Sequence, residues 1–251
     1  MTRFSYELAG PIGTSATLGL IVLQTDETIE HDFRRIFTAN DISLYVTRVP
    51  SGLEVTSDTL AMMSGNLPAA ANLLPKSLTY DVVGYGCTSG TAVIGPAKIA
   101  EQVKSGCSAL QVTDPLSALV AMCEHRGVRR LGFLSPYIAS VSQTLRDALA
   151  TRQIETPVFG SFDEGEEAKV ARISENSLYH ATMTLGQSSE VDAVFLSCTN
   201  LRTLDVIPRI EQDLGKPVYS SNQVLAWHMA RLAGVKLSLA EKRLNLNAAK
   251  T

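Results

Sequence analysis

Residues 81–89 read D-V-V-G-Y-G-C-T-S, and residues 192–200 read D-A-V-F-L-S-C-T-N. In each stretch an aspartate precedes a short apolar run, which ends near a cysteine followed by threonine and a small polar residue. Cys87 and Cys198 thus occupy the same place in two copies of one local pattern, separated by nearly half of the chain. A sequence that repeats at about half its length usually folds as two similar lobes. The repeat therefore predicts two lobes that face each other and bring both cysteines to one cleft.

A second repeat supports this organisation. Leu-Gly-Leu-Ile at 18–21 is echoed by Leu-Gly-Phe-Leu at 131–134, at nearly the same offset as the two cysteines. Apolar or β-branched runs predict strands at 17–23, 42–49, 81–85, 108–112, 130–135, 156–159, 192–197 and 217–220. Helical spacing predicts helices at 29–39, 57–74, 91–103, 115–124, 138–151, 164–185, 201–214 and 221–233. Strands that alternate with helices in this way indicate an α/β fold with parallel sheets.

Composition is typical of a soluble globular protein. The 251 residues are 45% hydrophobic and 19% charged, with a formal net charge of −3 at pH 7. Nucleic-acid binding is not expected, because the sequence has no Lys/Arg-rich patch. No apolar stretch approaches the roughly 20 residues that span a bilayer. Residues 1–15 lack the charged-then-apolar layout of a signal peptide, so we expect a cytoplasmic protein with no membrane contact.

The four cysteines are expected to be free thiols, as is usual in a reducing compartment. None is paired with another as C-x-x-C, and the four histidines lack the spacing of metal ligands, so no metal site is expected. Cys107 and Cys123 are interpreted as packing residues, because free cysteine behaves as a small buried hydrophobe.

Each motif cysteine is predicted to lie where a strand ends and a helix begins. Ligands of parallel sheets bind at this edge, and a helix N-terminus offers unpaired N–H groups and a positive dipole end. We expect this setting to lower the thiol pKa from about 8.5 and to favour the nucleophilic thiolate. The same N–H groups, with the hydroxyls of Thr88 and Ser89, can hold a carboxylate. Thr199 and Asn200 offer similar groups at the second cysteine.

Two facing cysteines favour a two-sided reaction. One thiolate attacks or deprotonates a carbon while the other thiol donates a proton from the opposite side. The alternative is that both are merely small buried residues at tight turns, as cysteine often is. The recurrence of Cys-Thr-polar after two apolar runs favours the functional interpretation.

The cysteine motifs resemble those of a known superfamily. G-Y-G-C-T-S-G-T at 84–91 and L-S-C-T-N at 196–200 are similar to the catalytic motifs of the aspartate/glutamate racemase superfamily. Within it, the chain resembles the maleate cis–trans isomerase and arylmalonate decarboxylase group, from about residue 17 to residue 233. Residues 19–35, followed by Y-V-T-R-V-P at 45–50, are most similar to the ectoine-utilisation proteins of this group.

The resemblance implies two pseudo-symmetric, flavodoxin-like lobes with the active site between them. On this sequence one lobe is predicted to comprise 1–113 plus 218–251, and the other 114–217. The resemblance also implies that no cofactor or metal is needed, that the substrate is a small carboxylate or amino acid, and that the protein forms a homo-oligomer.

Family roles can be assigned to residues of this chain by the same resemblance. Cys87 matches the first catalytic cysteine of the family and Cys198 the second. Arylmalonate decarboxylases keep only the second cysteine, so the presence of both argues against decarboxylation. Tyr137 matches a tyrosine whose hydroxyl contacts the substrate carboxylate in maleate isomerases; the alternative is a half-buried tyrosine after a strand. Carboxylate-binding positions of the family fall on Thr88, Ser89, Thr199 and Asn200.

One position departs from the maleate isomerase pattern. These enzymes have an asparagine in the loop after the first strand, and here Asp26 aligns with it. A carboxylate would repel a dicarboxylate substrate, so we hypothesise that Asp26 meets a substrate ammonium. The alternative is that Asp26 only caps the helix that starts at residue 29. The other asparagine of the family has no secure counterpart, although Asn176 lies nearby.

The sequence therefore predicts a cofactor-independent isomerase that uses two facing cysteines on a small carboxylate. The maleate isomerase group favours cis–trans isomerisation of an alkene. Asp26 and the likeness to ectoine-utilisation proteins favour racemisation of an amino acid, with a diaminobutyrate-type compound as one substrate. A non-catalytic two-lobed binding protein is the alternative of a different class, against which the paired cysteines count.

Overall fold

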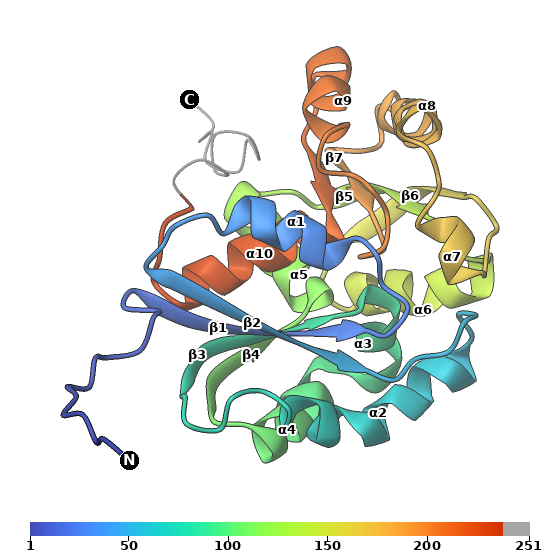
Figure 1. Ribbon diagram of the computed structural model, residues 1–251. Helices are drawn as coiled ribbons and strands as arrows, with labels where there is room; N and C mark the ends of the chain where they lie inside the picture. Colours follow the sequence, from blue (N-terminus) through green and yellow to red (C-terminus); the bar gives the residue numbers. More distant parts are fainter. Residues whose placement is uncertain (238–251) are drawn as a thin grey trace.

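Two parallel four-stranded sheets form the centre of the computed structural model, which describes residues 1–237 (Figure 1). The first sheet contains β1 (Ala16–Leu23), β2 (Ile42–Val49), β3 (Tyr80–Gly86) and β4 (Ala109–Thr113), in the order β2-β1-β3-β4. The second contains β5 (Arg130–Ser135), β6 (Glu155–Ser161), β7 (Ala193–Leu196) and β8 (Val218–Ser220), in the order β6-β5-β7-β8. The two halves of the chain repeat one strand order, and the predicted α/β fold with parallel sheets is confirmed.

Helices cover the sheets and connect their strands (Figure 1). Within residues 1–237 they are α1 (Ile29–Ile36), α2 (Ser57–Ala71), α3 (Thr88–Ile94), α4 (Pro96–Gly106), α5 (Pro115–Arg126), α6 (Ala139–Ala150), α7 (Glu167–Val170), α8 (Glu175–Gly186), α9 (Ile207–Leu214) and α10 (Ser221–Leu232). All eight residues of β1 and all four of β7 are buried, because helices cover both faces of these parallel strands. This burial explains why the strands read as nearly continuous apolar runs.

The bounds predicted for the helix at 91–103 are wrong. It starts earlier, at Thr88, and is divided into α3 and α4 at Gly95, whose φ of 90° suits glycine. Pro96 then starts α4, where its missing N–H costs nothing. The earlier start places the N-terminus of α3 directly at Cys87.

Two further predicted helices are shorter than their apolar periodicity suggests. The helix predicted at 164–185 is divided into α7 and α8, and the Ser174 side chain caps α8 by accepting the N–H of Ser177. The helix predicted at 201–214 begins only with α9, so that the residues after Cys198 form a loop. In both places, backbone predicted to be helical forms an irregular segment near the second cysteine motif.

Two hydrophobic cores run through both halves of the chain. Leu20 and Phe133 belong to one core, and Ile21 and Leu134 belong to the other. Neighbouring strand residues enter different cores because they point to opposite faces of a sheet. Burial of each such side chain stabilises the fold by roughly 1.5–3 kcal/mol.

The last helix returns to the first sheet. α10 follows β8 of the second sheet but packs against β3, β4 and α5. The division of the chain into lobes of 1–113 plus 218–251 and 114–217 stays a prediction, and residues 238–251 of the first lobe lie outside the described part of the chain.

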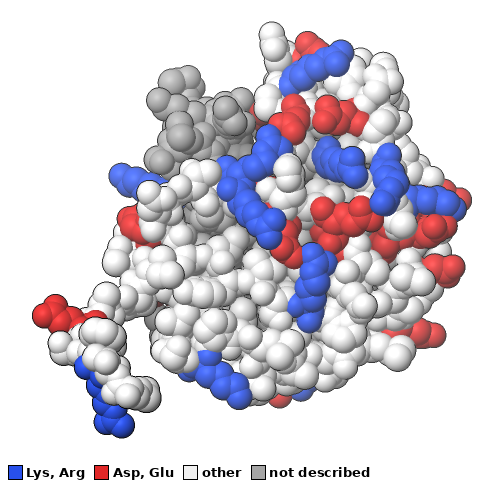
Figure 2. All heavy atoms as spheres, viewed as in Figure 1, with Lys and Arg blue, Asp and Glu red and all other residues white. Residues whose placement is uncertain are grey.

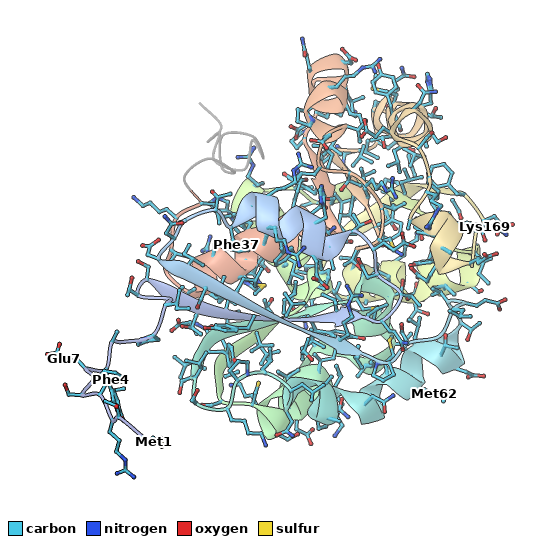
Figure 3. The ribbon with its side chains drawn as sticks, viewed as in Figure 1. Met1, Phe4, Glu7, Phe37, Met62 and Lys169 are labelled. Atoms are coloured by element: carbon cyan, nitrogen blue, oxygen red, sulfur yellow. The ribbon has the colours of Figure 1, made fainter. Side chains whose placement is uncertain are left out.

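The surface is mixed in character. The N-terminal segment extends away from the sheets (Figures 1 and 3), and its Phe4 side chain is 84% exposed. On the face seen in Figure 2, acidic and basic side chains are interspersed over the upper part of the molecule, and no single-sign patch dominates. Among residues 1–237, no helix is both long and apolar enough to cross a membrane.

Candidate active site

Cys87 and Cys198 each follow the carboxyl end of a strand, at the edge where parallel sheets bind ligands. Cys87 is the N-cap of α3, and its Sγ accepts the N–H of Gly90 at 3.2 Å. The Sγ of Cys198 accepts the N–H of Asn200 at 3.3 Å in the loop after β7. The φ of Cys198 is 156°, a positive value that residues with side chains seldom adopt and that is often found at functional sites. The two loops thus present their thiols in a similar way.

Both thiols line one small buried cavity. Its volume is about 10 Å³, which is room for little more than one water molecule. The residues around it are Leu23, Val55, Leu60, Cys87, Thr88, Ser89, Tyr137, Glu167, Cys198 and Thr199. Among these described residues, Glu167 is the only Asp, Glu, Lys, Arg or His. Six of the eight residues predicted to form the site therefore meet at this cavity, while Asp26 and Asn200 lie behind it.

Two backbone hydrogen bonds close the cavity on one side. The N–H of Val55 donates to the carbonyl of Gly165 at 3.1 Å, and the N–H of Glu167 donates to the carbonyl of Leu53 at 3.2 Å. These bonds join the segment after β2 to the segment before α7, so the two halves of the chain meet here. Val55 and Glu167 both line the cavity, so these bonds hold two parts of its wall together.

A buried network connects Tyr137 to the second cysteine. The hydroxyl of Tyr137 lies 3.0 Å from Sγ of Cys198 and donates to Oε1 of Glu167 at 2.6 Å. Oε2 of the same carboxyl accepts the Nδ2–H of Asn200 at 2.7 Å. Burial raises the pKa of Glu167, although its hydrogen bonds from Tyr137 and Asn200 oppose that rise. Tyr137 thus lies in the cavity, fully buried rather than half-buried.

The threonines after the two cysteines connect the halves of the chain. The hydroxyl of Thr88 donates to Oγ of Ser221 at 2.7 Å, and Ser221 also accepts the N–H of Cys198 at 3.0 Å. The hydroxyl of Thr199 donates to the carbonyl of Gly86 at 3.3 Å. Ser89 is buried at the cavity wall. Each cysteine loop is therefore held by a partner from the opposite half or from α10.

Asp26 caps α1. Its Oδ1 accepts the N–H groups of Thr28 and Ile29, each at 2.8 Å, which are the contacts that the helix-cap alternative requires. Burial raises the pKa of Asp26, while those two N–H groups lower it. The charge of Asp26 acts on both thiols and raises their pKa values. Asp26 thus lies close enough to influence the cavity, and its contact with a substrate ammonium stays a hypothesis.

The expected acidity of the thiols is contradicted. Burial raises the pKa of Cys87 to about 12, and the charges of Glu167 and Asp26 reinforce the rise, while the N–H of Gly90 opposes it. Burial likewise raises the pKa of Cys198 well above its ordinary value, again with a contribution from Glu167. The sequence indicates the helix N-termini but not the depth of burial or the nearby carboxyl groups. Burial therefore favours the neutral thiol form of both cysteines in this arrangement.

Sequence reasoning missed Glu167 and the polar start of α10. Glu167 belongs to no motif, and its role depends on a contact with Tyr137 from a distant segment. Ser221 and Asn222 carried a signal, because they follow a strand in a polar run, and both are almost fully buried. Asn222 donates to the carbonyl of Thr199 at 2.9 Å and so supports the second cysteine loop. Asn176 is exposed and is not among the residues of the cavity.

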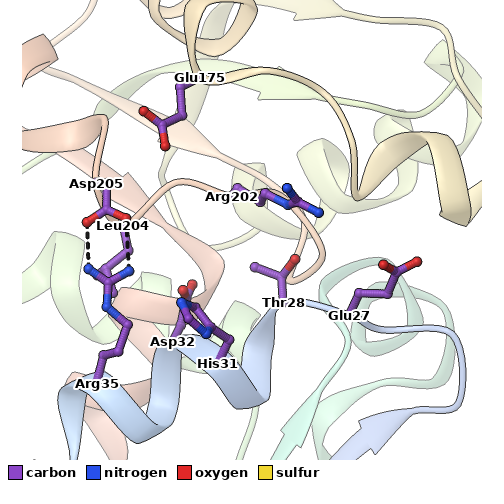
Figure 4. A pocket seen from close by; sticks show the side chains of 9 residues that line it. All are labelled: Glu27, Thr28, His31, Asp32, Arg35, Glu175, Arg202, Leu204 and Asp205. Carbon is purple, nitrogen blue, oxygen red and sulfur yellow. Dashed lines mark hydrogen bonds and ion pairs between the residues drawn. The ribbon is translucent and has the colours of Figure 1, made fainter.

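A second, more open pocket is lined by residues that include Thr28, Arg35 and Asp205 (Figure 4). Its volume is about 300 Å³, and Arg35 and Asp205 form an ion pair at its edge with N–O distances of 2.9 and 2.5 Å. The hydroxyl of Thr28 in its wall donates to the carbonyl of Asn200 at 2.9 Å. Neither motif cysteine lines this pocket, and Thr28 connects its wall to the loop that follows Cys198.

Comparison with known proteins identifies relatives that are decarboxylases or isomerases. The arylmalonate decarboxylase family model matches residues 97–244. The arylmalonate decarboxylase of Bordetella bronchiseptica is 26% identical over 231 residues, which is 88% of this chain and 92% of that protein. The maleate isomerase of Alcaligenes faecalis is 23% identical over 163 residues, which is 62% of this chain and 64% of that protein.

Solved structures share the fold. A maleate isomerase of Pseudomonas putida S16 crystallised with maleate has a TM-score of 0.79 at 19% identity, covering 88% of this chain and 92% of that one. The maleate cis–trans isomerase of Nocardia farcinica with a covalently bound succinylcysteine intermediate has a TM-score of 0.78 at 21% identity, covering 88% and 93%. The family model matches more than half of the sequence, including the second cysteine motif. This chain therefore belongs to the arylmalonate decarboxylase family.

Proposed function

We propose that the protein is a cofactor-independent isomerase in which Cys87 and Cys198 act together on a small carboxylate substrate. The observation that supports this most is that the two thiols, one from each half of the chain, line the same buried cavity. A reaction that needs groups on two faces of one carbon centre suits this arrangement. The curated relatives include a decarboxylase and maleate isomerases. We favour isomerisation because this chain has both motif cysteines, whereas arylmalonate decarboxylases of the family keep only the second.

Cis–trans isomerisation of an alkene diacid is the first form of the proposal. The thiolate of Cys87 adds to one alkene carbon as the π bond breaks, and Cys198 donates its proton to the adjacent carbon. Rotation about the resulting single bond is followed by return of that proton to Cys198 and cleavage of the S–C bond. The product is the trans alkene, and both cysteines end in their starting states. The succinylcysteine intermediate of the Nocardia farcinica enzyme is an adduct of this kind.

Racemisation of an amino acid is the second form, and Glu167 favours it. One cysteine removes the Cα proton while the other donates a proton to the opposite face, so the substrate inverts with no net change in atoms. A cavity whose only strongly acidic or basic side chain is a carboxyl suits a substrate ammonium better than a second carboxylate. A diaminobutyrate-type compound, as expected from the likeness to ectoine-utilisation proteins, carries such a group.

Proton NMR of the purified protein in deuterated buffer tests the proposal. Separate samples hold maleate, phenylmalonate, aspartate, diaminobutyrate and the acetylated forms of the two amino acids, with the Cys87→Ser variant as the control. Fumarate formed from maleate supports alkene isomerisation, and exchange of a Cα proton in an amino compound supports racemisation. Loss of carbon dioxide from phenylmalonate by the wild type overturns the isomerase in favour of a decarboxylase. No reaction in any sample, with tight binding of one compound, favours a binding protein.

A further inference from the structure

The hydroxyl of Tyr137 lies between two groups that compete for its single proton. Oε1 of Glu167 lies 2.6 Å from the phenolic oxygen, and Sγ of Cys198 lies 3.0 Å from it. A phenol has one O–H, so it donates to one of these groups and accepts from the other. A carboxylate is the stronger acceptor, and the shorter distance is typical of a charge-assisted hydrogen bond. The phenolic oxygen is therefore free to accept the S–H of Cys198.

The second oxygen of Glu167 fixes the direction of this chain of hydrogen bonds. Oε2 accepts the Nδ2–H of Asn200 at 2.7 Å, so donors approach both carboxyl oxygens. The orientation of the Asn200 amide is fixed in turn, because its Oδ1 accepts the backbone N–H of Glu27 at 2.8 Å. Donors on both carboxyl oxygens favour the ionised form of Glu167 and oppose the rise in its pKa that burial causes.

Cys87 has no such chain of acceptors. Its Sγ accepts the N–H of Gly90 at 3.2 Å, and a hydrogen bond from the Tyr85 hydroxyl further lowers its pKa against the effect of burial. Tyr85 is buried beside Met63, whose sulfur is a weak acceptor at 3.8 Å, and so its proton is available to the thiol. A hydrogen bond from the neighbouring phenol lowers the pKa of either thiol. The two phenols differ in the acceptor that competes with the thiol, which is only the Met63 sulfur for Tyr85 but the Glu167 carboxyl for Tyr137.

We propose that Glu167 is a positioning residue that keeps the proton on Cys198, by holding the Tyr137 hydroxyl in the orientation that accepts the thiol S–H. Cys198 is then the proton donor of the pair, and Cys87 is the base or nucleophile. The charged and titratable groups that face Glu167 are Tyr137, Asp26 and the two thiols, and Asn200 is its neutral partner. The catalytic consequence rests on the proposed function, but the proton arrangement itself does not.

Alkylation of each thiol by iodoacetamide across a pH series tests the assignment without any substrate. Mass spectrometry follows the peptides of Cys87 and Cys198 separately. Because both thiols line one cavity, each serves as the internal reference for how readily iodoacetamide reaches the other. In the wild type, the apparent pKa of Cys87 is expected to be the lower of the two. A lower apparent pKa for Cys198 overturns the proposal, and this measurement needs no variant to fold.

The Glu167→Gln variant gives a second, sharper test. The amide oxygen of Gln is expected to face Asn200, so that its NH₂ group donates to the Tyr137 oxygen and turns the phenolic proton toward Cys198. The alkylation rate of Cys198 below its pKa is then expected to rise by about tenfold, as for a shift of roughly one pH unit, relative to that of Cys87. Glu166→Gln is the matched control, because Glu166 is exposed and its carboxyl pairs with Lys169 alone among residues 1–237, and this variant is expected to behave as the wild type.

A double-mutant cycle separates this arrangement from a simple effect of charge. The charge of Glu167 acts on both thiols, but only Cys198 is joined to it through Tyr137. In a Tyr137→Phe background the effect of Glu167→Gln on Cys198 is expected to fall to the effect on Cys87, which is the part due to charge alone. Equal shifts of both cysteines in the presence of the phenol, or an excess shift of Cys198 that persists without it, overturn the proposal. Because the readout is alkylation, the result tests the proton arrangement whether or not the NMR assays detect isomerisation.

Discussion

The hydroxyl groups of Thr88 and Ser221 lie 2.7 Å apart and connect the two cysteine loops. Thr88 follows Cys87 directly, and Ser221 accepts the backbone N–H of Cys198 at 3.0 Å. One serine at the start of α10 therefore holds the second cysteine loop and reaches the first. The relative position of the two thiols depends on this short chain of bonds, because neither cysteine is bonded directly to the other half through its own side chain in the described residues.

Replacement of Ser221 by alanine is expected to destabilise the protein and reduce turnover. The variant leaves the N–H of Cys198 and the hydroxyl of Thr88 without their partner in a buried setting, which costs roughly 1–3 kcal/mol. Urea unfolding gives the change in the free energy of unfolding. Ser105→Ala is the control, because that exposed hydroxyl bonds only the carbonyl of Gln102. Equal unfolding midpoints for Ser221→Ala and the control would show that the link between the loops contributes little.

Serine in place of either motif cysteine is expected to lower turnover strongly. Loss of a positioned acid or base typically costs a factor of about 10²–10⁴, and a serine hydroxyl is far less acidic and less nucleophilic than a thiol. The rate is measured with whichever substrate the NMR assays identify. Cys107→Ser is the matched control, since Cys107 is half-buried away from the cavity and donates only to the Val103 carbonyl. A Cys87→Ser variant that keeps the wild-type rate contradicts the two-cysteine mechanism.

Replacement of Asp26 by asparagine tests its two interpretations. The amide oxygen can still accept the N–H groups of Thr28 and Ile29, so the free energy of unfolding is expected to change by less than about 1 kcal/mol. If Asp26 meets a substrate ammonium, the variant loses affinity for amino compounds relative to their non-amino analogues. Calorimetric titration with matched pairs of ligands measures the preference. An unchanged preference leaves Asp26 as a helix cap.

Asp32 is expected to make stability depend on pH. Burial raises its pKa from 3.8 to about 6, although its hydrogen bond from Asn222 opposes the rise. The folded protein therefore holds this proton more tightly than the unfolded chain does. Its contribution to stability is fully present below pH 3.8 and is lost as the pH rises through about 6.

The Asp32→Asn variant isolates this contribution. At pH 7.5 the variant is expected to be more stable than the wild type by on the order of 1–3 kcal/mol, because it has no buried charge to desolvate. The difference should shrink toward pH 4, where the wild-type carboxyl is protonated in the folded state. Urea unfolding of both proteins from pH 4 to 7.5 measures the difference directly. A constant difference across that range contradicts the assignment of the titration to Asp32.

The fold could be predicted from the sequence because buried parallel strands have a recognisable composition. The strands predicted at 42–49 and 130–135 have those bounds in the structure, since each is rich in apolar or β-branched residues and is followed directly by a proline, Pro50 or Pro136. The repeated motif also placed both cysteines at the ends of strands, and the cavity between them follows from the topology. Such features depend on local pattern and on the general behaviour of parallel sheets.

The chemistry of the site was less accessible from the sequence. Glu167 lies inside a stretch whose apolar spacing continues through the turn between α7 and α8, so periodicity does not reveal that its side chain reaches the cavity. The pKa values of the thiols depend on burial and on carboxyl groups brought from distant segments. Local motifs therefore indicate where a cysteine lies along a strand and helix, but its acidity is a property of the assembled core.

Burial of the cavity also affects how the thiols of the resting protein react with oxidants. Peroxides attack thiolates much faster than thiols, and oxidation to sulfenic acid requires access to the sulfur. Cys87 and Cys198 are at most 5% exposed, and burial keeps both protonated. A pair of thiols that is buried and protonated is expected to react slowly with peroxides. Sulfenic acid formation at either cysteine therefore requires that the cavity open to the oxidant.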